Sequence, residues 1–110
     1  MIALVGTWRI PAGDEAARFT DRYHNDHVPV VRSLPGLRRH VVGRADGGPG
    51  YERWTAQLWF AHLAALRGAE SSAEWRAVSA TGVMSQAHDL EMTIYELDDW
   101  YPAPGPETAA

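Results

Sequence analysis

Residues 23–37 read YHNDHVPVVRSLPGL, which predicts the end of a helix, a turn and the start of a strand. Pro29 has no amide hydrogen and restricts the residue before it, so the helix must bend or end near Val28. Pro35 and Gly36 then form a turn signal. Two histidines and an aspartate lie in the four positions before Val28, so titratable groups gather where the helix ends.

The rest of the chain divides into alternating strand and helix patterns. Apolar and alternating residues predict strands at 2–10, 37–44, 54–61 and 90–97, and helical periodicity predicts helices at 14–31, 62–69 and 72–87. Asp14 and Ser72 are the expected N-caps. The β-α-β-β-α-β order predicts an α+β fold of the ferredoxin-like kind, a four-stranded antiparallel sheet with helices on one face.

Residues 1–97 are expected to form one domain, and residues 98–110 a Pro-, Gly- and Ala-rich tail in which Trp100 and Tyr101 could dock. The helices of such a domain cover one face of the sheet, but the other face also carries Leu, Val and Trp. A bare apolar face is a site for a partner. We therefore expect a homodimer that packs sheet to sheet about a twofold axis.

Composition excludes several classes of function. The 110 residues carry a net charge of -4 and no basic run, which argues against nucleic acid and anionic membranes as partners. The apolar runs are too short to span a membrane. The first residues include no basic leader, so we expect a cytoplasmic protein. Because the chain has neither Cys nor Lys, thiolate, zinc–thiolate and Schiff-base chemistry are excluded.

Two histidines are the strongest candidates for chemistry. Phe19, Tyr23 and His27 recur every four residues, and this stripe points His27 under the sheet. His40 lies on the next strand and would face the same space if its side of the strand faces the helices; a one-residue slip would reverse that. Two imidazoles in one pocket can divide acid and base roles near neutral pH. A structural alternative for His27 is interaction with the last helical carbonyls.

Other motifs give little support to different chemistry. HNDH lacks the H-E-x-x-H spacing and a third ligand, so no metal site is expected. ADGGPG lacks the register of a nucleotide-binding loop and is typical of a hairpin connection. No G-x-S-x-G elbow is present. His24 lies off the apolar stripe, and His62 and His88 fall at helix ends, where cap or surface roles are common.

The residues Phe19, Tyr23, His27 and Pro29, followed by the L-P-G-L of residues 34–37, resemble the EthD-like family. The resemblance covers roughly residues 1–97 and implies a dimeric α+β barrel with a pocket between sheet and helices. It also implies relatives that include cofactor-free enzymes acting on aromatic polyketides or ring lactones, monooxygenases and haem-binding proteins. The similar methylmuconolactone isomerases use a histidine at the position of His27 and a tyrosine where this chain has His40.

The first hypothesis is a cofactor-free enzyme of the cyclase, isomerase or dehydratase type acting on a hydrophobic aromatic or polyketide-like substrate. His27 would be the primary general acid or base, oriented by Tyr23 or a backbone carbonyl, and His40 its complement or a carbonyl ligand. The expected substrate-binding residues share an aromatic or imidazole ring that could orient or wall a flat molecule: Tyr23, Phe19, Trp8, Trp59, Tyr95 and His88.

Three alternatives use the same pocket. In an anthrone-type oxygenation, the substrate carbanion itself would reduce oxygen. A haem-dependent monooxygenase would need His27, His40 or His88 as an axial ligand. A non-catalytic dimer would bind a small molecule without transforming it. The sequence leaves these readings open.

Overall fold

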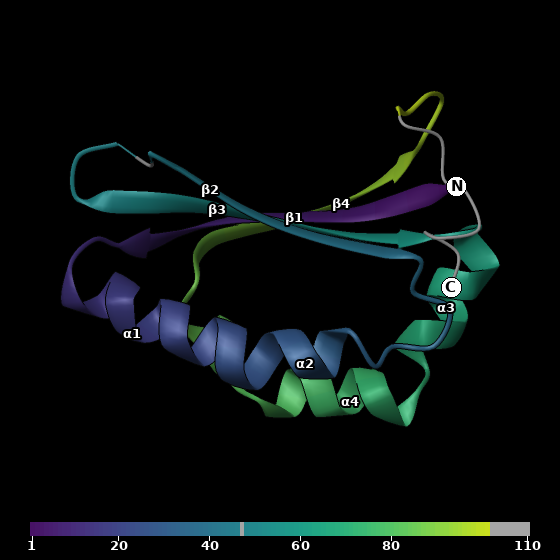
Figure 1. Cartoon of the computed structure of the whole chain (residues 1–110), viewed down its shortest axis with the longest axis horizontal. Coiled ribbons are helices and arrows are strands. Elements are labelled where there is room, and N and C mark those ends of the chain that lie inside the picture. The colour runs from purple at the N-terminus through teal and green to yellow at the C-terminus, as the bar shows by residue number, and fades with distance from the viewer. Residues whose placement is uncertain (47, 102–110) are drawn as a thin grey trace.

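The computed structural model describes residues 1–46 and 48–101. Its elements in chain order are β1 (Ile2–Pro11), α1 (Asp14–Arg22), a π-helical segment (Tyr23–His27), α2 (Val28–Val31), β2 (Arg39–Asp46), β3 (Tyr51–Phe60), α3 (Leu63–Glu70), α4 (Ala73–Ala80), a 3-10 turn (Val83–Gln86) and β4 (His88–Glu96). The strands form one antiparallel sheet in the order β2-β3-β1-β4, and the helices lie along one face of it (Figure 1). The predicted ferredoxin-like α+β fold is confirmed.

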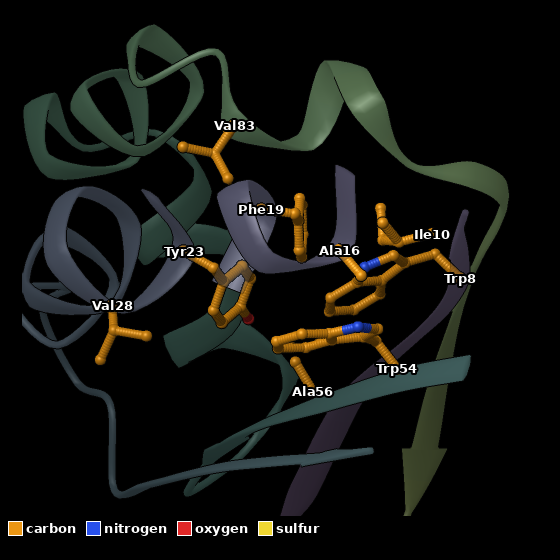
Figure 2. Close-up of a cluster of buried hydrophobic side chains, with 9 residues drawn as sticks. All are labelled: Trp8, Ile10, Ala16, Phe19, Tyr23, Val28, Trp54, Ala56 and Val83. Carbon is orange, nitrogen blue, oxygen red and sulfur yellow. The ribbon is translucent and has the colours of Figure 1, made fainter. Parts of the chain in front are cut away.

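An aromatic cluster fills the space between the sheet and α1. Strand alternation puts Trp8 and Trp54 on the helix side, where they are paired across β1 and β3 and stack with ring centroids 6.1 Å apart. Phe19 meets the edge of Trp54 at 5.1 Å, and Tyr23 lies 5.3 Å from the same ring (Figure 2). All four side chains are almost fully buried. This cluster fixes the position of the helix on which Tyr23 and His27 lie.

The predicted helix at 14–31 is interrupted by a wider turn. Between α1 and α2, the amide of Val28 donates to the carbonyl of Tyr23, five residues back, instead of the usual four. Pro29 then falls in the first turn of α2, where a missing amide hydrogen costs least. The helix begins after Gly13, so the expectation that Asp14 is the N-cap was wrong by one residue.

The predicted helix at 72–87 is shorter in the structure. Ser72 is the N-cap, as expected, and its hydroxyl accepts from the amide of Trp75 at 3.1 Å. The helix stops at Ala80 because Gly82 adopts the left-handed conformation, with φ of +68°, that commonly ends helices. Thr81 therefore lies at the helix end rather than within it.

The face of the sheet opposite the helices is less bare than expected. Trp100 packs edge-on against Trp59 on this face, with ring centroids 6.2 Å apart, and Trp59 is nearly buried. Tyr101, the other residue considered for docking, is 98% exposed. The rest of the predicted tail, residues 102–110, lies outside the described residues. Within the described part of the chain, no helix is long and apolar enough to cross a membrane.

Alanine should have opposite effects at two exposed glycines. At Gly82 it should lower the free energy of unfolding by about 1 kcal/mol, because a side chain disfavours positive φ. At Gly68, inside α3, it should raise that free energy by about 0.5–1 kcal/mol. Neither new Cβ would have another atom within 4 Å, so no steric clash confuses the comparison. Urea unfolding curves measure both; a stabilising Gly82→Ala would contradict the assigned turn.

Candidate active site

A cavity of about 210 Å³ lies between the sheet and the helices. Its floor comes from the four strands, and its other walls come from the π-helical segment, α2, α4 and the 3-10 turn. The residues that line it are Leu4, Gly6, Trp8, Tyr23, His27, Val31, Leu34, His40, Ala56, Leu58, Trp75, Val78, Met84, Leu90 and Met92. Most of these side chains are aliphatic or thioether groups, so the few polar atoms stand out: one phenol, two imidazoles and two indole N–H groups.

His27 is held in one orientation by Thr81. The imidazole is 6% exposed, and its Nδ1 lies 3.0 Å from the Thr81 hydroxyl oxygen. That hydroxyl has a single proton, which it donates to the carbonyl of Val78 at 2.9 Å. Toward His27 the hydroxyl must therefore accept, so Nδ1 carries the ring proton of neutral His27. The other nitrogen, Nε2, is left with a free lone pair.

Thr81 is itself fixed from two directions. Arg22 on α1 donates to the Thr81 carbonyl at 3.2 Å, which ties the end of α4 to the helix that carries His27. Gly82 supplies the left-handed turn directly after it. These contacts limit the positions that the hydroxyl can adopt, so the tautomer of His27 depends on the end of a different helix.

His40 is held in the other neutral tautomer, with its proton on Nε2. It is paired with Leu58 across β2 and β3, on the side of the sheet that faces the helices. Its Nδ1 accepts from Arg32 Nε at 3.4 Å, so the proton of the neutral ring lies on Nε2. That Nε2 is buried and has no hydrogen-bond partner within residues 1–46 and 48–101. An unpaired buried donor is costly, on the order of 1–3 kcal/mol, and a ligand oxygen could satisfy it.

Both imidazoles are held uncharged near neutral pH. Burial lowers the pKa of His27 below its ordinary 6.5. Burial, the positive charge of Arg32 and the proximity of His27 together lower the pKa of His40 to about 4. Burial also raises the pKa of Tyr23 to about 12, so its phenol keeps its proton. The cavity thus joins a neutral hydrogen-bond donor and a neutral proton acceptor.

The structure brings together four of the eight predicted site residues. His27, His40, Tyr23 and Trp8 all line the cavity, which resolves the open question of which side of its strand His40 occupies. The ring centroids of Tyr23 and His27 are 5.0 Å apart. Phe19 does not line the cavity; it is fully buried in the aromatic cluster and supports Trp8 and Tyr23 from behind.

The other three predicted residues lie elsewhere. Trp59 alternates with Leu58 on β3, so when Leu58 lines the cavity Trp59 faces the opposite side of the sheet. Tyr95 is on that same opposite side of β4 and is 52% exposed. His88 begins β4, is exposed and packs against the ring of Tyr51. None of the three lines the cavity, so their placement in the pocket was wrong.

Sequence reasoning missed the residues that orient the imidazoles. Thr81 was assigned to the middle of a helix, although the following Gly82 is a common helix-end signal and would have placed a hydroxyl there. Arg32 follows α2, and no sequence pattern marked it. Its contact with His40 depends on the position of β2 relative to the end of α2, which is tertiary structure.

Candidate metal and haem ligands are few. No group of three or more His, Asp or Glu side chains in the described ranges is arranged to share a metal ion. His24 is exposed and does not line the cavity. Of the three histidines considered as haem ligands, His27 and His40 face the cavity and His88 does not.

The chain is similar to several known proteins in sequence or in fold. No family model matches the chain. An uncharacterized 11.0 kDa protein in the thcB-thcC intergenic region of Rhodococcus erythropolis is 32% identical over 69 residues, which cover 60% of this chain and 67% of that protein.

Solved structures share the fold over nearly the whole chain. An EthD family protein from Bacillus halodurans has 24% identity and a TM-score of 0.72, with 88% of this chain and 98% of that chain covered. SnoaB from Streptomyces nogalater, a cofactor-independent oxygenase, has 16% identity and a TM-score of 0.65, with 93% and 97% covered. The chain thus belongs to one family with the Rhodococcus protein, and it shares the fold of the EthD family protein.

Proposed function

We propose that this protein is a cofactor-independent enzyme that transfers a proton on a hydrophobic carbonyl compound, as an isomerase, cyclase or dehydratase. One observation supports the proposal above all others. Two neutral imidazoles, one with an unused lone pair and one with an unused N–H, line one apolar cavity. His27 offers a lone pair on Nε2, and His40 offers a hydrogen on Nε2. Removal of a proton next to a carbonyl requires this combination of a base and a donor to the carbonyl oxygen.

The first step transfers one proton and shifts one electron pair. His27 Nε2 takes a proton from the carbon next to the carbonyl, and the C–H electron pair moves toward the carbonyl oxygen to give an enolate. His40 Nε2–H hydrogen-bonds that oxygen and stabilises the charge as it develops. The imidazolium of His27, stabilised by Thr81 at Nδ1, then holds the proton for return. No cofactor is needed for these transfers.

The fate of the enolate determines the reaction type. Return of the proton to a different carbon gives an isomer, attack on a second carbonyl closes a ring, and loss of a β-hydroxyl gives a dehydrated product. All three begin with the same proton removal. The apolar walls favour them because a dry cavity strengthens the hydrogen bond to the enolate oxygen.

Oxygenation is a second candidate. The same carbanion could pass electrons to molecular oxygen, which would become bonded to that carbon. The fold shared with the cofactor-independent oxygenase SnoaB favours this candidate. Oxygen consumption during turnover distinguishes it from isomerisation, cyclisation and dehydration, which consume none.

Replacing His27 by Gln should abolish most of the activity. A general base typically contributes about 10²–10⁴-fold, so exchange of α-hydrogens for deuterium in a bound ketone should slow by at least about 10²-fold. NMR of the ketone in D₂O follows this exchange. The matched control is His24→Gln, which changes the exposed histidine one turn earlier and should leave the rate unaltered. Equal rates for the two variants would contradict a base role for His27.

The same assay tests the role of Thr81. Thr81→Val keeps the shape but removes the acceptor for Nδ1–H, so the rate should fall about tenfold or more as the ring loses its orientation. Thr81→Ser should restore it.

In wild type, the rate should also fall as the pH drops below 6.5 through the lowered pKa of His27, because a protonated ring cannot accept a proton.

The two imidazoles should titrate as a coupled pair. His27 is one of the groups that lower the pKa of His40, so His27→Gln should move that pKa upward from about 4 toward 6.5. NMR titration of the His40 ring protons measures this shift, and His24→Gln should leave it unchanged. Identical His40 titration in wild type and His27→Gln would count against a shared cavity.

We further propose that the face opposite the helices pairs with a second copy of the chain. Val5 and Val41 lie on this face, and Tyr95 is half exposed there, which supports an apolar interface. Sedimentation at micromolar concentration should show a dimer. Tyr95→Arg should weaken the dimer, whereas Tyr101→Arg, at a fully exposed site, should not. A wild-type monomer under these conditions would exclude the dimer.

A further inference from the structure

The size of the cavity limits the ring system that can enter it. An apolar cavity of about 150 Å³ is enough to hold benzene. The cavity here measures about 210 Å³, roughly 1.4 times as large. The extra space is comparable to one additional fused ring. A flat three-ring compound would therefore extend beyond the walls, past the side chains at the edge strand.

The polar atoms of the cavity match a neutral ligand. None of its lining residues is Arg, Asp or Glu, and both imidazoles are uncharged near neutral pH. A carboxylate in this cavity would lose its hydration and meet no cationic side chain among the lining residues, which is strongly unfavourable. A ketone or aldehyde oxygen needs only one donor, and His40 Nε2–H is an unpaired donor at the wall.

Met92 is the more adjustable of the two β4 side chains that form the outer wall of the cavity. Met92 on β4 is paired with Gly6 on β1, and its sulfur lies 2.9 Å from the position that a Cβ on Gly6 would occupy. Because Gly6 has no side chain, Met92 can lie flat across the strand and narrow the cavity there. Met92 is 53% exposed, and Leu90 beside it is 44% exposed, so these two side chains lie between the cavity and the surface at this edge.

We infer that the substrate is an uncharged carbonyl compound with one ring or two fused rings, and that Met92 sets the upper limit on its size. This inference rests on the proposed function, which it deepens by naming the class of substrate. The carbonyl oxygen accepts from His40 Nε2–H, and the acidic C–H faces His27 Nε2. The ring lies against the aliphatic walls.

Four probes test this inference by binding alone. They are 1-tetralone, a two-ring ketone; tetralin, its analogue without the carbonyl; 1-naphthoate, a two-ring anion; and 9-fluorenone, a three-ring ketone. Shifts of the indole N–H signal of Trp8, which lines the cavity, report binding by NMR. We expect 1-tetralone to bind at least tenfold more tightly than 1-naphthoate or 9-fluorenone. Its advantage over tetralin should be several-fold and should disappear in His40→Phe.

Two variants on β4 separate the size limit from general changes in the strand. Met92→Ala should remove part of the outer wall and improve the affinity for 9-fluorenone at least tenfold. Glu91→Ala, at an exposed site on the opposite face of the same strand, should not change it. Both sites are exposed, so neither variant threatens the core.

The outcomes distinguish the inference from the proposed function. Tight binding of 1-naphthoate or of 9-fluorenone to wild type overturns the inference, as does failure of all four probes to bind or an unchanged limit in Met92→Ala. If 1-tetralone binds as expected but its α-hydrogens never exchange in D₂O, the binding class stands and the proposed proton transfer fails.

Discussion

The hydrogen bond between His27 and Thr81 is the contact on which the site depends. It joins the break in the first long helix to the end of α4, two points 54 positions apart in sequence. Each end requires a local irregularity: a wider turn before Pro29 on one side, and a left-handed glycine after Thr81 on the other. The imidazole is therefore oriented by tertiary structure, and a change in either helix end would release it.

Around that contact, burial serves both packing and chemistry. The aromatic cluster of Trp8, Phe19, Tyr23 and Trp54 anchors α1 to the sheet and gives the fold much of its buried apolar surface. The cavity lies directly beside this cluster, and the same low-polarity surroundings keep the two imidazoles neutral. The protein thus keeps a costly unpaired donor in its interior, as expected where a ligand completes the hydrogen bonding.

Much of the fold could be predicted because local patterns agree with the global order. Alternation identified four strands, and Pro29 located the helix break. The side of β2 that carries His40 could not be predicted, since strand pairing decides it. Trp59 and Tyr95 were placed in the pocket on residue type, whereas their register places them on the other face. Thr81 was missed because the helix was predicted to continue past Gly82 to residue 87.

The edge position of β4 has a consequence for the kinetics of ligand entry. This strand pairs with β1 alone, and all nine of its residues are exposed. A strand with so few buried contacts opens locally at much lower free energy than the core strands do. Brief fraying of this sheet margin would therefore widen access to the cavity, while the central pair of strands stays closed.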